Sequence, residues 1–226
     1  MDEARKTNAL RGPGFIARFL SGKVIDIGAG ADLVAPHAER FDLDDGDANV
    51  ITRYRPAGVY DAVHSSHCLE HMIKPTAALN EWWALLKPGG YLVVVVPHED
   101  LYEQGIWPSI FNRDHKTTFR LDQPDSWSAV SHDIRALCSA LPGAEIVSAE
   151  IQDVHYDRSL MLAPGEFRRR NVWWLRIAKS IGGRIPAIGP SFKKWAENAA
   201  VRHGVPLDQT TREALAQIQV VTRKKP

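Results

Sequence analysis

A short apolar run that ends in a glycine turn is the feature that most constrains the fold of this chain. Residues 23–27 read Lys-Val-Ile-Asp-Ile, and Gly28, Ala29 and Gly30 follow directly. Such a run is typical of a parallel strand that is buried on both faces. Glycine allows a sharp turn and leaves room for a ligand where a Cβ would otherwise stand. The pattern therefore predicts the first strand of an α/β sheet, with a binding turn at its carboxyl end.

Further patterns along the chain extend this sheet. We expect strands at 40–42, 60–65, 91–96, 145–151 and 214–222, and helices within 2–20, at 75–86 and at 128–141. The alternation of strands and helices predicts an α/β fold that is Rossmann-like and doubly wound, with a mostly parallel sheet. The last strand alternates apolar and polar residues, so we expect it at an edge of the sheet.

The length of 226 residues fits one domain with additions, so we expect a single domain over 1–226. Residues 153–212, between the last two strands, are too many for a hairpin loop and predict a helical insertion. Its basic and aromatic stretch 167–179 has the length of a helix. We expect that helix to pack on the sheet or on a second subunit, which makes a homo-oligomer through 153–212 one interpretation. An anionic partner ranks next and a membrane surface last, and no nucleic acid is expected.

The chain begins with polar and charged residues, and no stretch approaches the ~20 apolar residues that a membrane span needs. We therefore expect a cytoplasmic protein without a transmembrane segment. Its cysteines, Cys68 and Cys138, have neither a partner pattern for disulfides nor the spacing of a structural zinc site.

An acidic cluster, residues 42–47, follows the second expected strand. A carboxylate at such a strand tip can accept hydrogen bonds from both hydroxyls of a ribose, and Asp42 stands in that position. Asp47 is expected to face the adenine end of the same ligand, whereas the other acids form turns or are solvated. Counted from Gly28, the third glycine of a dinucleotide fingerprint is replaced by Leu33, which argues against NAD or FAD.

Five features in a fixed order resemble a known family. They are the turn at 24–30, the acid at Asp42, Gly-Asp-Ala at 46–48, the segment 61–71 that ends in Leu-Glu-His, and Leu-Leu-Lys-Pro-Gly-Gly at 85–90. The chain resembles the class I S-adenosylmethionine-dependent methyltransferases, in their small-molecule branch, over about residues 15–151 and again at 214–224. It departs from their pattern between Asp26 and Asp42, which are only 16 positions apart, and between Asp47 and Asp61, where a helix and the third strand are nearly absent.

The resemblance implies S-adenosyl-L-methionine as the cofactor. Our leading interpretation is methyl transfer to an oxygen or nitrogen of a small molecule, such as a saccharide or its nucleotide-linked precursor. The resemblance also implies which residues surround the cofactor. Asp26, Gly28, Ala29 and Gly30 would flank the methionine part. Asp42 would hold the ribose and Asp47 would lie near the adenine. Ser65, Ser66 and His67 would lie near the sulfonium.

The loop from His98 to Lys116 is the expected source of a general base, since it leaves the carboxyl end of the strand at 91–96. Imidazole accepts a proton near neutral pH, so His115 is the first candidate, oriented by Asp114 or Glu103, and His98 is the second. Aromatic residues of this loop, Tyr102, Trp107 and Phe111, are expected to wall the acceptor pocket, with Asn112 supplying a polar group.

No metal is expected. His67 and His71 share a face at helical spacing, but metal-dependent methyltransferases usually add carboxylates at matching strand ends, and the sequence does not place these. Two other functions compete with methyl transfer. One is a cofactor-binding or scaffold protein of this fold that has lost its chemistry. The other is a nicotinamide-dependent oxidoreductase, which the absence of a third glycine and of a Tyr-x-x-x-Lys pair disfavours.

Overall fold

The chain folds around one six-stranded sheet in the order β2-β1-β3-β4-β8-β7. The computed structural model describes residues 3–162 and 189–226. The strands are β1 (Val24–Ile27), β2 (Glu39–Phe41), β3 (Tyr60–Ser66), β4 (Leu86–Pro97), β7 (Ala144–Gln152) and β8 (Gln217–Lys224). The first four strands are parallel, and β8 pairs antiparallel with both β4 and β7. The expected mostly parallel, doubly wound α/β fold is confirmed.

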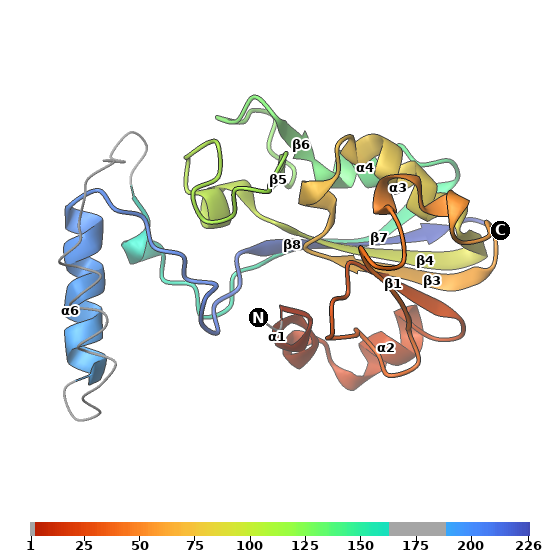
Figure 1. Ribbon diagram of the computed structural model, residues 1–226, viewed down its shortest axis with the longest axis horizontal. Helices are drawn as coiled ribbons and strands as arrows, with labels where there is room; N and C mark the ends of the chain where they lie inside the picture. Colours follow the sequence, from red (N-terminus) through yellow and green to blue (C-terminus); the bar gives the residue numbers. More distant parts are fainter. Residues whose placement is uncertain (1–2, 163–188) are drawn as a thin grey trace.

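Helices cover both faces of the sheet (Figure 1). On one face lie α3 (Pro75–Ala84) and α4 (Ile134–Ser139), and on the other lie α1 (Glu3–Leu10) and α2 (Pro13–Phe19). The α3 side holds the larger core. Trp82 is fully buried there and donates its indole N–H to the carbonyl of Ala48 at 2.9 Å. Burial of this large ring therefore leaves its N–H group with a hydrogen-bond acceptor.

Two expected elements differ from the structure. Of the helix expected at 128–141, only α4 forms, because β6 (Ser131–Asp133) pairs with β5 (Thr118–Arg120) in a separate two-stranded sheet. The side chain of Asp133 then caps α4 by accepting from the backbone N–H of Ala136 at 2.9 Å. The last strand, expected at an edge, lies inside the sheet as β8, and β7 forms the edge on that side. The interior position of β8 agrees with the burial of its residues Val220 and Val221.

The middle of the chain is shortened, as the sequence indicates. No helix forms between β1 and β2, and residues 28–38 run as turns and loop. Between β2 and β3 there is only the short 3₁₀ segment η1 (Ala48–Arg53). The sheet therefore ends at β2 on this side.

Within the stretch 153–212, the structure describes η4 (Arg158–Leu160) and the helix α6 (Gly189–Arg202). Figure 1 shows α6 at one end of the molecule, beyond the end of the sheet. The helix expected at 167–179 lies outside the described residues. In the part of the chain that is described, no helix is long and apolar enough to cross a bilayer.

Candidate functional site

The carboxyl ends of β1, β2, β3 and β4 meet at one edge of the sheet, and the candidate site is built there. Gly28 and Gly30, after β1, both have left-handed backbones, with φ of 75° and 58°. A Cβ at Gly28 would stand 2.6 Å from the Cβ of Cys68, whereas a Cβ at Gly30 would meet only Asp42 Oδ2, at 4.0 Å. Gly28 is thus required for packing against the segment after β3, and the half-buried Ala29 leads to Gly30, which faces open space.

Asp42 lies where the sequence predicts, at the tip of β2. It fixes the glycine turn, since its Oδ2 accepts from the backbone N–H of Gly30 at 2.7 Å and its Oδ1 accepts from that of Leu43 at 2.8 Å. Arg40 braces the same loop by donating to the carbonyl of Gly30 and to Asp45. Leu43 is 90% exposed directly beside the carboxylate. A polar acceptor and an apolar side chain thus stand together at this tip.

Asp47 is exposed and caps η1, where its Oδ1 accepts from both the backbone N–H and the side-chain amide of Asn49. These hydrogen bonds hold the pKa of Asp47 below its ordinary value. Asp47 therefore remains ionised at the far side of the site from β4.

Asp26 is buried, and protein groups occupy both of its oxygens. Oδ1 accepts from His64 Nδ1 at 2.6 Å and Oδ2 from the backbone N–H of Val34 at 2.7 Å. His64 Nε2 lies 3.2 Å from Arg11 Nη2, and Arg11 also donates to Gln219 Oε1. Because arginine only donates and the carboxylate only accepts, His64 is neutral with its proton on Nδ1. Asp26 thus supports the turn from within the protein.

Burial sets the charge states in this network. It lowers the pKa of His64, an effect that the neighbouring Asp26 opposes and Arg11 reinforces. Burial also lowers the pKa of Arg11 to about 10, so that the guanidinium stays charged at neutral pH. The positive charge of Arg11 then compensates the negative charge of Asp26, with the neutral imidazole of His64 between them.

Ser65, Ser66 and His67 end β3 beside the glycine turn. The hydroxyl of Ser66 has no hydrogen-bond partner among the described residues, although its oxygen is buried. Ser65 is fully buried. His67 has a left-handed backbone with φ of 52°, and its Nε2 lies 2.9 Å from Gln217 Oε1 of β8.

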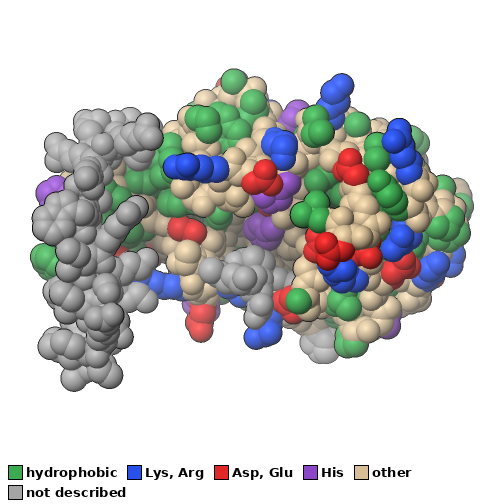
Figure 2. All heavy atoms as spheres, viewed as in Figure 1, with side chains coloured by type: hydrophobic (Ala, Val, Ile, Leu, Met, Phe, Trp, Pro, Cys, Tyr) green, Lys and Arg blue, Asp and Glu red, His purple; other side chains and the backbone are tan. Residues whose placement is uncertain are grey.

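A group of histidines surrounds Glu70, which belongs to η2 (Leu69–His71). Glu70 is 1% exposed, and neither of its oxygens receives a hydrogen bond of ordinary geometry from the described residues. The nearest nitrogens to Oε1 are His67 Nδ1 at 3.5 Å, His71 Nε2 at 3.9 Å and His115 Nε2 at 3.9 Å. Burial by itself would raise the pKa of Glu70, but the three imidazoles reverse this and lower it. Figure 2 shows histidine side chains gathered near the middle of this face of the molecule.

Carboxylates contact the Nδ1 atoms of two of these histidines. His115 Nδ1 lies 2.6 Å from Oε1 of the buried Glu103, and His71 Nδ1 lies 3.0 Å from Oδ2 of the exposed Asp114. Of the two orienting acids expected for His115, the structure selects Glu103, which the π-helical turn η3 (Glu99–Glu103) presents. Asp114 instead contacts His71 and Lys116.

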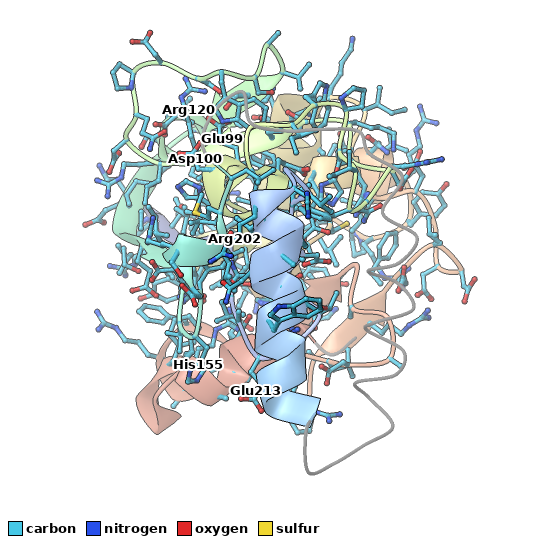
Figure 3. All side chains as sticks on the ribbon, turned by 90° about the vertical axis from the view of Figure 1, so that its left-hand side faces the viewer. Glu99, Asp100, Arg120, His155, Arg202 and Glu213 are labelled. Carbon is cyan, nitrogen blue, oxygen red and sulfur yellow. The ribbon has the colours of Figure 1, made fainter. Side chains whose placement is uncertain are left out.

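His98, the second candidate base, has a structural position. It is 3% exposed and caps η3, with Nδ1 accepting from the backbone N–H of Asp100 at 3.1 Å. Burial lowers its pKa. The next residue, Glu99, accepts from hydroxyls of β5, β6 and the loop between them, among them Thr118 at 3.0 Å. Figure 3 shows Glu99 and Asp100 on the same side of the molecule as Arg120 of β5.

Aromatic rings flank the histidines. Tyr102 lies between His115 and Phe111, with ring centroids 5.2 Å and 5.8 Å away, and the rings of His71 and His115 are 5.0 Å apart. Asn112 turns back to its own loop and accepts from the backbone N–H of Asp114 at 3.1 Å. Tyr102 thus lies beside His115 with Phe111 next to it, while Asn112 stabilises the turn before His115; that the rings wall an acceptor pocket stays a prediction.

The comparison with protein families decides what kind of protein carries this site. A family described as a methyltransferase domain matches residues 1–181. The chain belongs to this methyltransferase family. Among solved structures, a SAM-dependent methyltransferase from Archaeoglobus fulgidus is 14% identical, with 99% of this chain and 95% of that chain covered and a TM-score of 0.50. A protein from Bacillus halodurans C-125, assigned as a methyltransferase, is 11% identical, with 100% of both chains covered and a TM-score of 0.50. These structures show the same fold. No curated protein matches the chain.

The cofactor of this methyltransferase is S-adenosyl-L-methionine, and the residues at the sheet edge suit it. The space in front of Gly30 is open to a ligand, and the Asp42 carboxylate beside it has acceptor capacity left for hydroxyl groups. The exposed Leu43 offers an apolar surface, and the unpartnered hydroxyl of Ser66 offers a hydrogen bond at the end of β3.

Sequence reasoning missed two parts of the methyltransferase site. His64 and Arg11 were not singled out, although a histidine within the apolar strand 60–65 is a signal that a buried partner exists. Glu70 and His71 were set aside as metal ligands because further carboxylates at matching strand ends could not be placed. The structure adds carboxylates of another kind, Glu103 and Asp114, which contact Nδ1 of His115 and His71 from a loop more than thirty residues farther along the chain.

We predict that His64 makes stability fall as the pH falls. Its folded pKa is lowered, so below the ordinary value of about 6.5 the unfolded chain binds a proton that the folded chain does not. Stability should then drop by up to about 1.4 kcal/mol for each pH unit between that value and the folded pKa. In His64→Gln, whose amide can donate to Asp26 and accept from Arg11, urea unfolding at pH 7 and pH 5 should show a smaller drop. An unchanged difference between the two pH values would contradict this.

We predict that Asp42→Asn weakens the binding of S-adenosylhomocysteine. Asparagine keeps an oxygen for Gly30 but loses the charge that strengthens hydrogen bonds from ribose hydroxyls, worth about 1.5–3 kcal/mol. The dissociation constant should rise roughly 10- to 100-fold in calorimetric titration. The matched control is Asp44→Asn in the same cluster, whose side chain is 88% exposed and whose affinity should stay that of the wild type. Equal affinities in both variants would remove Asp42 from the ribose site.

Proposed function

We propose that this methyltransferase acts on an oxygen or nitrogen of a small-molecule acceptor, with a saccharide-type compound as the class to test first. One observation carries the proposal. His115 is held by Glu103 at 2.6 Å, beside aromatic rings and the end of β3. A histidine held at Nδ1 by a buried carboxylate has the arrangement of a general base, because Nε2 is left to accept a proton.

S-Adenosyl-L-methionine would supply a methyl group on a positively charged sulfur: the acceptor's lone pair would bond to the methyl carbon in line as the carbon–sulfur bond breaks and S-adenosylhomocysteine leaves. The protein's main task is then alignment of the acceptor. When the acceptor is a hydroxyl, its proton must also leave, and His115 takes it. Glu103 stabilises the resulting imidazolium, because its negative carboxylate then faces a positively charged ring. His98 remains the second candidate for this role, and Asp114 acts on His71.

Tyr102 and Phe111 give the acceptor pocket an apolar wall. Flat aromatic surfaces with a few polar groups are typical of small-molecule sites. We propose that the loop 98–116 forms this wall, and that residues 153–212 cover the acceptor side or join two copies of the chain. Trp195 of α6 supports the second proposal, since this large apolar side chain is 54% exposed.

We predict that His115→Ala lowers the methyl-transfer rate about 100-fold or more, because loss of a general base costs roughly 10² to 10⁴. The affinity for S-adenosylhomocysteine should not change, since His115 is not among the cofactor residues. A higher pH should restore part of the rate if the acceptor then loses its proton unaided. The measurement is transfer of labelled methyl from the cofactor into acceptors of a cell extract.

His98→Ala is the comparison variant. A normal rate in His115→Ala with a loss in His98→Ala would transfer the role to His98, and normal rates in both would show that no protein base is needed. Cofactor binding by the wild type without transfer to any acceptor would favour a scaffold of the same fold.

We predict that the chain forms a homo-oligomer through residues 153–212. Light scattering after size-exclusion chromatography should then give more than one chain mass, and Trp195→Ser should shift the protein toward the monomer because it removes exposed apolar area. A wild-type monomer at all concentrations tested would contradict the homo-oligomer and leave only the proposal that residues 153–212 cover the acceptor side.

A further inference from the structure

The cluster around Glu70 brings together three side chains that can each donate a lone pair to a metal ion. Glu70, His71 and His115 each offer a ligand atom, and these atoms all lie within 4.8 Å of one another. Glu70 Oε1 is 3.9 Å from Nε2 of His71 and 3.9 Å from Nε2 of His115. Zinc–ligand bonds of about 2.0–2.2 Å in a tetrahedron put the donors roughly 3.3 Å apart. Glu70 Oε1 thus lies about 0.6 Å beyond ligand spacing from each imidazole nitrogen, and the set as a whole spans up to 4.8 Å, so the side chains would draw together around an ion.

The groups behind the histidines fix which ring nitrogen faces the cluster. Glu103 and Asp114 accept from Nδ1 of His115 and His71. In a neutral imidazole the other nitrogen, Nε2, then carries a lone pair. Both lone pairs point to the neighbourhood of a carboxylate oxygen that itself only accepts. A carboxylate behind each histidine is also the usual outer layer of a metal site, where it sets the ring orientation.

The buried negative charges of Glu70 and Glu103 also favour a bound cation. Glu70 and Glu103 are 1% and 2% exposed, and among residues 3–162 and 189–226 no Lys or Arg forms an ion pair with either. Their orphan oxygens, both of Glu70 and Oε2 of Glu103, are buried without a hydrogen bond from this part of the chain. Two buried negative charges are costly unless a cation compensates them. A divalent ion between the three donors would balance both charges.

We propose that Glu70, His71 and His115 bind a divalent transition-metal ion. Two imidazoles and one carboxylate favour Zn²⁺, Co²⁺ or Fe²⁺ over Mg²⁺ and Ca²⁺, which prefer oxygen ligands throughout. Three protein ligands leave at least one position open, as in catalytic rather than structural sites. His67 Nδ1 lies 3.5 Å from the same oxygen of Glu70.

His115 is also the proposed general base, so the inference rests in this one respect on the proposed function: an acceptor hydroxyl held beside His115 would lie near the ion. A metal-bound hydroxyl loses its proton at lower pH than a free one. His115 Nε2 cannot bind the ion and accept a proton at the same time. In the metal-loaded protein His115 is a ligand and the ion activates the acceptor, whereas Nε2 is a base only in the metal-free protein.

The test uses the full chain, treated with a chelator and then titrated with Co²⁺, whose visible absorption reports ligand type and geometry. We expect stoichiometric binding with the spectrum of a mixed nitrogen and oxygen site, and retention of Zn²⁺ after dialysis. Glu70→Gln, which keeps the shape of the side chain, and His71→Ala should abolish both. Glu103→Gln should weaken binding about 10- to 100-fold, as loss of an outer partner does. The exposed His37 provides the control, and His37→Gln should bind like the wild type.

S-adenosylhomocysteine binding is measured on the same samples and should be unchanged in every variant, which shows that the variants are folded and separates this inference from the methyltransferase assignment. A wild-type chain that gives no Co²⁺ spectrum and retains no Zn²⁺ would overturn the proposal and assign the positive charge to a protonated histidine. Co²⁺ binding by Glu70→Gln equal to that of the wild type would overturn it as well.

Discussion

The whole arrangement depends on how the buried negative charge of Asp26 is satisfied in the first strand. A carboxylate inside an apolar sheet is tolerated only when its oxygens are hydrogen-bonded and its charge is compensated. His64 and the backbone of Val34 take its two oxygens, and Arg11 supplies the charge through the histidine. Gln219 then accepts twice from Arg11. This chain of contacts joins β1, β3, β8 and the end of the first helix, so it fixes the edge on which the site is built.

Glu70 and Glu103 contrast with Asp26. All three carboxylates are nearly inaccessible, yet only Asp26 has both oxygens bonded. The nearest histidine nitrogen, His67 Nδ1, lies 3.5 Å from Glu70, at the long limit of a hydrogen bond, and one oxygen of Glu103 has no partner in the described structure. Buried carboxylate oxygens without hydrogen bonds destabilise a protein, so stability does not explain why Glu70 and Glu103 are buried in this way. Both acids lie against the same histidine, His115, and this contrast with Asp26 is the basis of the metal proposal.

Local pattern was enough to predict the architecture. The apolar runs of β1 and β4 and the glycine turn are short-range signals, and Asp42 follows from its place after β2. The pairing of His64 with Asp26, by contrast, joins residues 38 positions apart, and the contact of His115 with Glu70 joins loops that only the fold brings together. The helix expected at 128–141 failed for a related reason. Three residues at its start pair with β5, and tertiary pairing outweighed helix periodicity there.

The absence of a helix between β1 and β2 bears on the choice of cofactor. In dinucleotide sites the pyrophosphate is held by the N-terminus of the helix that follows the glycine turn, where backbone N–H groups and the helix dipole favour negative charge. Here residues 28–38 form no helix, and carboxylates stabilise the loop instead, with Asp42 accepting from Gly30 and Asp26 from Val34. The edge thus presents acids rather than a positive helix end. Such an edge repels a pyrophosphate and suits a cofactor that carries a positive sulfonium and no phosphate, so the shortened loop favours S-adenosyl-L-methionine over the nicotinamide cofactors.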